Sequence, residues 1–342
     1  MDRRTAVFFA LSSLLLGGTF VAAKAGLEYF PPLLFVALRF DVAAVVMVVY
    51  VVATSTRAEL LPRSAGDVGS VLATGVLVIG LSNAFLFVGQ QYATSAVASI
   101  VFSLNPVLTP MFAAVLLSNE RLSARGAIGI ALGLVGVSLV VSPDPATLLG
   151  GDAIGRTILF VGAVSGALGA VLIRRIETGL SSTVRIAWGL PLAAILSHGL
   201  SWSAGESAAS IAWTTEALLA LAYVSLFAGV LAYVAYFSLI DSAGATRANL
   251  VFYVVPVVST VGGWALLDES VPPLAIVGFL TIFAGFAVLG SESIDVPGAV
   301  RTSSNRLSKA MSNGVSSRIR AEVSSPDDPV SSSEETRGYR SD

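Results

Sequence analysis

Cysteine is absent from this chain, and the residue types that build metal and phosphate sites are few. Without cysteine there can be no disulfide, thiolate nucleophile or cysteine-ligated metal, and the redox compartment cannot be read from the sequence. Histidine occurs once, at His198, so no pair of histidines can hold a metal ion. The two lysines, Lys24 and Lys309, lie outside any G-x-x-x-x-G-K loop. We therefore expect no metal or cofactor and no ATP site within this chain.

Charged residues are also scarce, at 12% of the chain, where soluble domains have roughly 25%. Hydrophobic residues make up 55%, and the mean hydropathy is +0.82. A soluble protein of this length needs more surface charge, so hydrocarbon is the expected main solvent. The formal net charge is -2 and the basic residues form no single patch, so nucleic acid is not an expected partner.

Long apolar runs take the place of charge. A bilayer core of roughly 30 Å needs about 20 apolar helical residues, and lipid offers no partner to backbone groups, so each run predicts a spanning helix. The runs cover residues 5–24, 33–53, 68–90, 95–117, 124–141, 156–173, 183–200, 216–240, 245–267 and 272–290. The sequence therefore predicts an all-α polytopic membrane protein with ten transmembrane helices. The first run lacks a small-residue cleavage site and is interpreted as a retained helix.

The positions of the basic residues predict an orientation. If the N-terminus is cytoplasmic, the outer connections carry only Lys24 and Arg156. The inner connections then carry Arg3, Arg4, Arg57, Arg63, Arg121, Arg125, Arg174, Arg175, Arg185 and Arg247. This is the positive-inside bias, and it predicts a multi-pass protein of the cytoplasmic membrane with both termini inside.

An internal repeat appears when the chain is compared with itself at a shift of 150 positions. The residues Ala93, Ala98, Val101, Phe102, Pro106 and Val107 then fall on Ala243, Ala248, Val251, Phe252, Pro256 and Val257. At a shift of 149, Gly129 and Gly136 fall on Gly278 and Gly285. A five-helix unit has an odd number of helices, so its second copy enters the membrane from the opposite side. Inverted repeats indicate a secondary transporter, although duplication for stability alone is the alternative.

The repeat divides the chain into four parts. Residues 1–142 form the first five-helix repeat, 143–155 a connecting loop, and 156–290 the second repeat. Residues 291–342 are rich in Ser, Asp, Glu and Arg without apolar periodicity, which predicts a disordered cytoplasmic tail. Pro106 and Pro256 lie well inside their predicted helices and should bend them. Glu120 and Glu269 stand at helix ends, where we expect each to cap the start of the next helix.

Several short motifs carry a family resemblance. They are Gly17-Gly18-Thr19-Phe20-Val21-Ala22-Ala23-Lys24, Pro31-Pro32, Leu38-Arg39-Phe40, Asn105-Pro106, Glu120-Arg121-Leu122, Pro256 and Asp268-Glu269. In this order and spacing the chain resembles the EamA branch of the drug/metabolite transporter (DMT) superfamily over about residues 5–290. The resemblance implies a DMT-like fold of two repeats around a central cavity. It also implies export or exchange of amino acids, other small metabolites or drugs.

Polar and aromatic residues within the spans are the candidates for a binding cavity. Amides facing lipid would lack partners, so the polar ones should face the bundle interior, where they bind substrate or hydrogen-bond a neighbouring helix. Aromatic residues on the same repeat segments could line an amphipathic pocket or simply pack. The candidates are Asn83, Phe87, Ser99, Phe102, Asn105, Tyr233, Tyr236, Asn249 and Tyr253.

Three charged residues are candidates for substrate binding or ion coupling. Arg39 and Asp41 lie about 10 Å inside one end of the second span, and Lys24 can reach that level, so a contact between Lys24 and Asp41 is expected. Such a pair could bind a charged substrate group or carry a coupling proton. The alternative is that Lys24 and Arg39 reach the headgroups while Asp41 forms an ion pair.

These features predict a secondary transporter that exports or exchanges small amphipathic metabolites by alternating access. Its partners would be the lipid bilayer, a small-molecule substrate and a coupling proton or cation. Two other classes stay open: a membrane scaffold or sensor, and an intramembrane enzyme. The sequence argues against the enzyme because it lacks the usual catalytic constellations.

Overall fold

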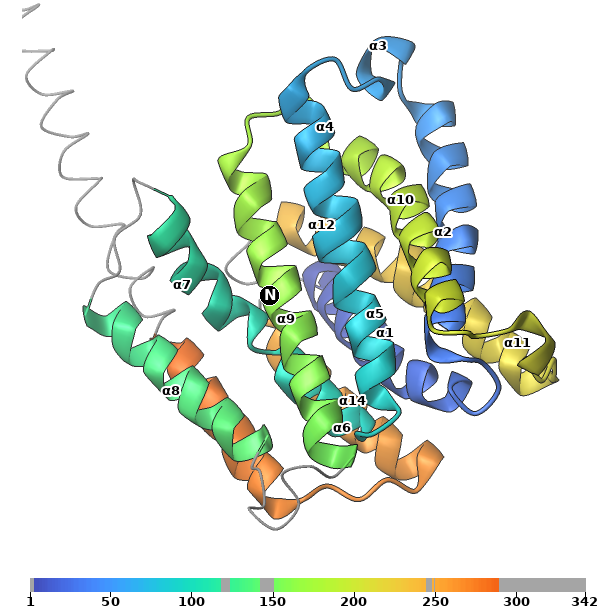
Figure 1. Ribbon diagram of the computed structural model, residues 1–342. Coiled ribbons are helices and arrows are strands. Elements are labelled where there is room, and N and C mark those ends of the chain that lie inside the picture. Colours follow the sequence, from blue (N-terminus) through green and yellow to red (C-terminus); the bar gives the residue numbers. More distant parts are fainter. Residues whose placement is uncertain (1–2, 118–123, 142–150, 244–247, 249, 289–342) are drawn as a thin grey trace, which may run out of the picture. The chain divides into compact units, whose positions relative to one another are not determined.

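A computed structural model describes residues 3–117, 124–141, 151–243, 248 and 250–288, and all regular structure in these ranges is helical (Figure 1). The predicted tail at 291–342 and most of the predicted connecting loop lie outside the described residues. Glu120 also lies outside them.

Helices follow one another along both halves, as the apolar runs predict. In the first half they are α1 (Arg3–Gly26), α2 (Pro32–Thr54), α3 (Arg57–Leu60), α4 (Ala65–Leu72), η1 (Ala73–Leu81), α5 (Ser82–Gln90), α6 (Ser95–Phe102), α7 (Asn105–Leu116) and α8 (Ala124–Val141). The second half contains α9 (Gly151–Arg175), α10 (Ser182–Ser203), η2 (Ala208–Ser210), α11 (Thr215–Ala222), η3 (Tyr223–Leu231), α12 (Ala232–Ala243), α14 (Val251–Leu267) and a final helix at Pro273–Val288. Each of the ten predicted spans coincides with one of these helices or with a run of adjoining ones, so the predicted fold class is confirmed.

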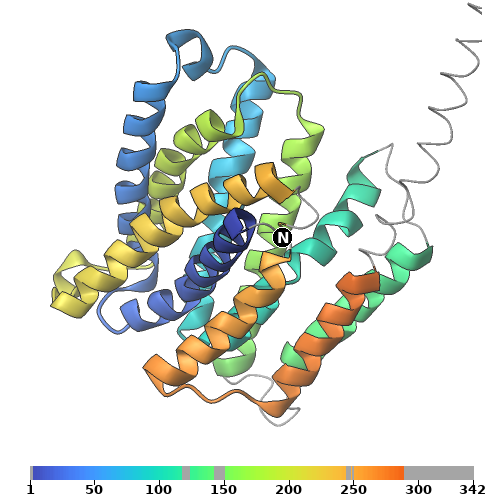
Figure 2. The same cartoon turned by 180° about the vertical axis from the view of Figure 1, so that it is seen from behind.

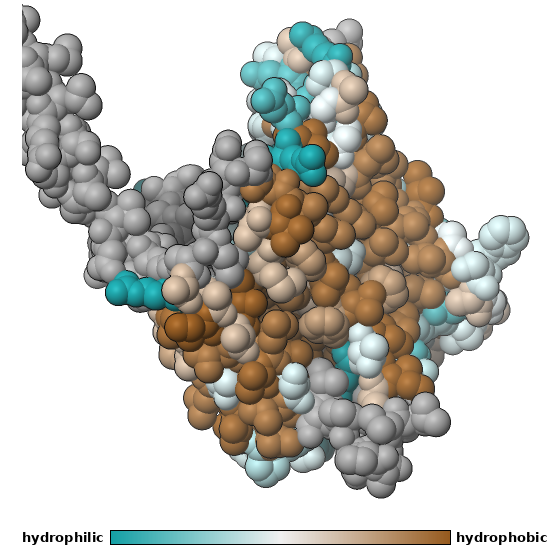
Figure 3. All heavy atoms as spheres, turned by 60° about the vertical axis from the view of Figure 1, so that its left-hand side comes forward, coloured by the Kyte–Doolittle hydropathy of each residue, from teal (hydrophilic) through white to brown (hydrophobic). Residues whose placement is uncertain are grey.

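Length and composition make most of these helices suitable for crossing a membrane. Six described segments meet both criteria: Arg3–Gly26, Pro32–Thr54, Ala65–Gln90, Ser95–Leu116, Ala153–Arg175 and Thr215–Tyr236. Three shorter apolar helices accompany them, at Ala124–Val140, Val251–Leu267 and Pro273–Val288. The helix α10 contains Arg185 and His198, which lower its hydropathy. Hydrophobic residues cover much of the side of the bundle in Figure 3, and hydrophilic residues gather toward its ends.

The two halves interlock around a pseudo-twofold axis. The helix α1 packs against α14 of the second half, and its counterpart α9 packs against α7 of the first. Figure 2 shows α1 between α12 and α14. The counterparts α2 and α10 pack directly against each other. Each half therefore completes the packing of the other.

Glycine contacts between α8 and the final helix show that the halves are antiparallel. A Cβ on Gly136 would lie 2.7 Å from the carbonyl oxygen of Gly278, and a Cβ on Gly285 would lie 2.6 Å from that of Gly129. Residue numbers thus rise along one helix as they fall along the other. Because Gly278 and Gly285 are the repeat equivalents of Gly129 and Gly136, each contact is the twofold image of the other. This is the arrangement of inverted repeats.

Carboxylates hold the halves together at both ends of the bundle. Helical residues continue from Ala65 to Gln90, so these two residues mark opposite ends. At the Ala65 end, Asp67 accepts hydrogen bonds from Thr178 Oγ1 at 2.7 Å and from Gly179 N at 2.9 Å. At the Gln90 end, Glu206 accepts hydrogen bonds from the backbone N–H groups of residues 33 and 34, at the start of α2.

The fourth span is divided rather than bent. The helix α6 ends at Phe102, and α7 begins at Asn105 with Pro106 in its first turn. The expectation that Pro106 lies well inside a helix is therefore wrong. Proline is tolerated in a first turn because its missing N–H would have no partner inside the helix. Pro256 does lie inside a helix, α14.

Substitution of Gly75 should test the close packing of the third span against α10. A Cβ there would lie 2.7 Å from the carbonyl oxygen of Gly189 and 3.0 Å from its Cα, so two backbones would have to separate. We expect Gly75→Ala to lower the free energy of unfolding by about 1 to 3 kcal/mol. The control is Gly199→Ala on α10, where a Cβ meets nothing within 4 Å. Unfolding midpoints in detergent measure both, and equal midpoints would contradict the packing.

Candidate functional site

A central cavity of about 330 Å³ lies between the two halves. Its walls come from α1, α2, η1, α5, α6 and α7 of the first half and from α9, η3 and α14 of the second. Small-molecule sites typically occupy about 300 to 1,000 Å³, so the volume suits a small ligand. Of the sequence candidates, the cavity wall includes Arg39, Asn83, Ser99, Phe102 and Asn105.

The central cavity lies on the pseudo-twofold axis. Many of its lining residues occur in pairs that differ by 150 positions, the offset of the sequence repeat. The pairs are Leu16 with Gly166, Phe20 with Ala170, Val78 with Ala228, Phe102 with Phe252, and Asn105 with Val255. Both halves therefore contribute equivalent positions to one shared space.

Arg39 and Asn83 form the most polar part of the cavity wall. Arg39 is 6% exposed, and its Nη1 donates to Asn83 Oδ1 at 3.1 Å. The guanidinium carbon lies 5.1 Å from the ring centroid of Phe40 and 5.4 Å from that of Phe87, which is cation–π range. The amide nitrogen of Asn83 donates to the carbonyl of Ile79 at 2.8 Å. These contacts fix the guanidinium at the cavity surface.

Asn105 presents an unused acceptor at the break between α6 and α7. Its amide nitrogen donates to the carbonyl of Phe102 at 3.1 Å, and its buried Oδ1 accepts no hydrogen bond from the described residues. Ser103, which the sequence analysis missed, donates to Ser99 O at 2.8 Å and to Phe252 O of the other half at 3.4 Å. A buried amide oxygen without a donor is costly, so a ligand donor could satisfy it.

Two wide helical turns adjoin the cavity at equivalent positions. The π-helical segments η1 and η3 differ by 150 positions at both ends. Val78 of η1 and Ala228 of η3 line the cavity. The π-bulges of helices often occur at functional sites. Apolar periodicity gives no signal for such turns, so the sequence could not reveal them.

The other aromatic candidates are placed away from the central cavity. Phe87 is fully buried and packs edge-on against Phe35. Tyr236 packs against Phe252, which itself lines the cavity. Tyr253 packs against two phenylalanines of the final helix, Phe283 and Phe286. The Tyr233 side chain and Asn249 lie outside the described part of the chain.

A second cavity of about 160 Å³ adjoins the central one. The two share Arg39, Val78 and Asn83 as wall residues. The second cavity continues along η1 and α10 to Arg185. From the sequence, Arg185 was noted only as one of the basic residues of the predicted inner connections. Arginine that lines a cavity cannot be told from arginine at a helix end by sequence alone.

Lys24 does not contact Asp41, so that expectation is wrong. Lys24 Nζ donates to the carbonyl of Gln90 at 2.6 Å and lines a third, polar cavity at the Gln90 end together with Glu28 and Glu269. Asp41 Oδ2 instead lies 2.9 Å from His198 Nε2 on α10, and both side chains are about half exposed. Residues 27–31 separate α1 from α2, and the side chain of Asp41 contacts α10 instead of α1. From the sequence, we had assessed His198 only as a possible metal ligand.

Glu269 caps a helix, although not the one expected. Both of its carboxylate oxygens lie 3.0 Å from the backbone N of Ser95, at the start of α6 in the other half. Ser259 Oγ also donates to Ser95 O at 2.8 Å. The helix α14, which ends just before Glu269, packs against α6, so the nearest helix start is that of α6. The cap therefore joins the two repeats.

Removal of this cap should destabilise the protein. Glu269→Ala leaves the Ser95 N–H without its charged acceptor, which we expect to lower the free energy of unfolding by about 1 to 3 kcal/mol. Glu28→Ala is the matched control because Glu28 lines the same polar cavity but is exposed. Thermal unfolding in detergent compares the two variants. If Glu28→Ala lowers the midpoint as much as Glu269→Ala, the cap is not what stabilises this end.

The chain matches the model of the EamA-like transporter family twice, over residues 3–142 and 153–291. It is 26% identical over 294 residues to the uncharacterized transporter YvbV of Bacillus subtilis (strain 168), covering 85% of this chain and 92% of that protein. It is 27% identical over 256 residues to the uncharacterized inner membrane transporter YedA of Escherichia coli (strain K12), covering 74% and 80%.

A crystal structure of another protein has a similar fold, with a TM-score of 0.56 at 21% identity. That similarity covers 84% of this chain and 97% of the other. The family match spans both helical halves, and the related proteins carry the name of transporters. This chain is a multi-pass membrane protein, and it belongs to the EamA-like transporter family.

Proposed function

We propose that this protein is a secondary transporter that exports or exchanges small amphipathic metabolites by alternating access through the central cavity. The observation that carries the proposal is the position of this cavity on the pseudo-twofold axis, where both inverted repeats line it with equivalent residues. Substrate sites of inverted-repeat transporters lie between their repeats. A site so placed can be exposed from either side when the halves exchange conformations.

The chemistry of the walls supports an amphipathic substrate. Polar groups come from the first half, where Arg39, Asn83 and Asn105 line the cavity. The equivalent positions in the second half are Gly189, Tyr233 and Val255. Aromatic rings from both halves, Phe102 and Phe252, complete the apolar part of the wall. A substrate with one polar end and one apolar end fits such an asymmetric cavity.

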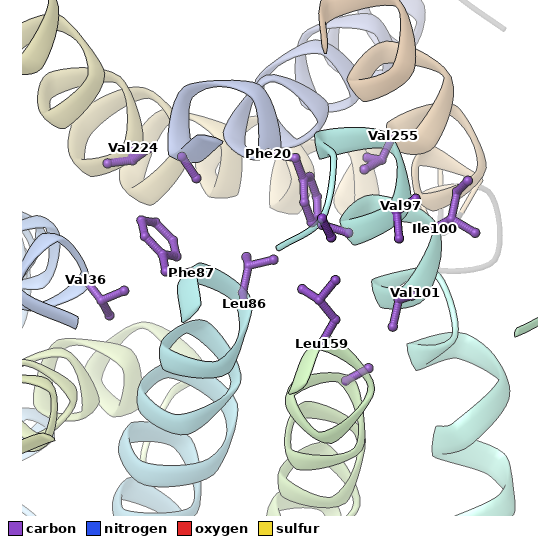
Figure 4. Packing of buried hydrophobic residues seen from close by; sticks show 14 of the residues in the cluster. Phe20, Val36, Leu86, Phe87, Val97, Ile100, Val101, Leu159, Val224 and Val255 are labelled. Atoms are coloured by element: carbon purple, nitrogen blue, oxygen red, sulfur yellow. The ribbon is translucent and has the colours of Figure 1, made fainter. Parts of the chain in front are cut away.

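Unequal packing at the two ends supports alternating access. The second cavity is lined by Thr74, Arg185 and Ile186, whose repeat equivalents are Val224, Phe35 and Val36. These equivalents are 0% exposed and belong to the same buried cluster as Phe87. Figure 4 shows Val36 and Val224 near Phe87. The position of the second cavity is thus hollow, whereas the equivalent position around Phe35 is filled. Exchange of the two packings between the repeats would open the opposite end.

Exchange of labelled metabolites in proteoliposomes tests the proposal. The purified chain should exchange some members of a panel of labelled carboxylic acids, amines and neutral aromatic compounds, with and without a pH gradient. Asn83→Ala removes the amide that fixes Arg39, and we expect the exchange rate to fall about tenfold or more. Ser138→Ala on the exposed face of α8 is the control and should leave the rate unchanged.

The folded fraction of each variant separates transport from packing. Normal exchange by Asn83→Ala would exclude Asn83 from the transport site. An equal loss of folded protein and of exchange would assign Asn83 to helix packing. No exchange of any compound by the wild-type chain would favour the scaffold or sensor class.

A further inference from the structure

The second cavity carries two arginines and no carboxylate among the described residues that line it. Arg39 belongs to α2 and Arg185 to α10, and the wall between them is mostly apolar, including Val78 and Ile186. A guanidinium in such surroundings attracts oxyanions more strongly than it does in water. The cavity therefore has the charge of an anion site.

The two arginines are carried at different levels along this cavity. Arg39 donates to Asn83, whereas Gly189, one helical turn beyond Arg185, packs against Gly75 next to Thr74. Thr74 and Asn83 both line the cavity and are nine residues apart on one helical run, or roughly 14 Å. The backbones that carry the two arginines therefore lie at different levels along the cavity. The arginines form two successive positions along one path.

Arg185 has donor capacity left for a ligand. Its Nη2 donates to Ser182 Oγ at 3.3 Å, and its buried Nε meets no acceptor in the described residues. A buried N–H without a partner is costly, and a carboxylate or phosphate oxygen would satisfy it. The equivalent position in the other repeat is the buried Phe35, so Arg185 has no charged counterpart there.

We propose that the second cavity binds the oxyanion group of the transported substrate, first at Arg185 and then at Arg39, where the two cavities meet. The inference rests on the proposed transport function and narrows its substrate class to amphipathic molecules with a carboxylate or phosphate. The predicted orientation places Arg185 on the cytoplasmic side, so the site would collect anionic metabolites for export.

Binding to the full chain in detergent tests the site without any transport. The probes are benzoate and benzamide, which have nearly the same shape but differ in charge, and thermal stabilisation at increasing concentration gives each Kd. We expect benzoate to bind about tenfold or more tightly than benzamide, and Arg185→Gln to weaken benzoate by a similar factor. Arg185→Lys should retain part of the affinity. Arg175→Gln, at the exposed end of α9, should leave it unchanged.

A second measurement covers the case in which Arg185→Gln fails to fold. An arginine-specific dicarbonyl reagent is applied to the wild-type chain, and modified peptides are mapped by mass spectrometry. Benzoate should protect Arg185 and leave Arg175 reactive. Equal binding of benzoate and benzamide, an unchanged Kd in folded Arg185→Gln, absence of benzoate binding, or absence of protection would overturn the proposal.

Two outcomes distinguish substrate binding at Arg185 from lipid binding and from the proposed transport function. Stabilisation by phosphatidylglycerol vesicles but not by benzoate would assign Arg185 to a lipid headgroup and overturn the substrate assignment. Benzoate binding that depends on Arg185, together with a complete lack of exchange in proteoliposomes, would support the anion site and contradict transport.

Discussion

Helices of each half of this chain pack directly against helices of the other half, and the rest of the structure depends on this packing. The helix α1 packs against α14, α9 against α7, and glycines of α8 against glycines of the final helix. Helix association in lipid depends on close van der Waals contact and hydrogen bonding, because lipid is as apolar as the side chains. Between the halves, the glycines allow close van der Waals contact, and the carboxylates of Glu206 and Glu269 accept hydrogen bonds. The central cavity lies where these interlocked halves meet.

Symmetry of the backbone is combined with asymmetry of chemistry. The repeats place equivalent positions around one cavity, yet the equivalent of Arg39 is Gly189, and the equivalent of Arg185 is Phe35. A charge in a low-dielectric interior is expensive unless it is held by hydrogen bonds and aromatic faces, as Arg39 is by Asn83 and Phe87. Such a residue is retained for recognition more readily than for stability. In the transport cycle proposed above, the inverted packing would provide the movement and the unequal side chains the selectivity.

The sequence predicted the fold more fully than the site. Long apolar runs and the matches at 150 positions gave the helices and their inverted order, because lipid permits little else. Asn83, Ser99, Phe102 and Asn105 were found as polar or aromatic interruptions, and all line the central cavity. Partner choice was harder. Lys24 and Asp41 were expected at similar depths in the membrane. Lys24 instead binds the carbonyl of Gln90 and Asp41 binds His198, because the direction of a side chain depends on the rotation of its helix.

Other features left no trace in the residue pattern. The π turns η1 and η3 depend on local hydrogen bonding that apolar periodicity does not encode. In the sequence, Arg185 looks like any basic residue near a helix end. It lines a cavity only because α10 packs beside η1. Glu269 was expected to cap the helix that follows it, yet it caps α6, which is distant in sequence and adjacent in space. Contacts between the repeats are therefore the hardest features to predict from a single sequence.

The shared cavity requires opposite orientation of the two repeats, and cysteine labelling tests this orientation most directly. The chain has no native cysteine, and Glu28 and Glu177 are exposed residues in equivalent connections after α1 and α9. In right-side-out vesicles, a membrane-impermeant thiol reagent should label Glu28→Cys and should label Glu177→Cys only after permeabilisation. Labelling of both from the same side would contradict inverted repeats and, with them, the shared cavity and its mechanism.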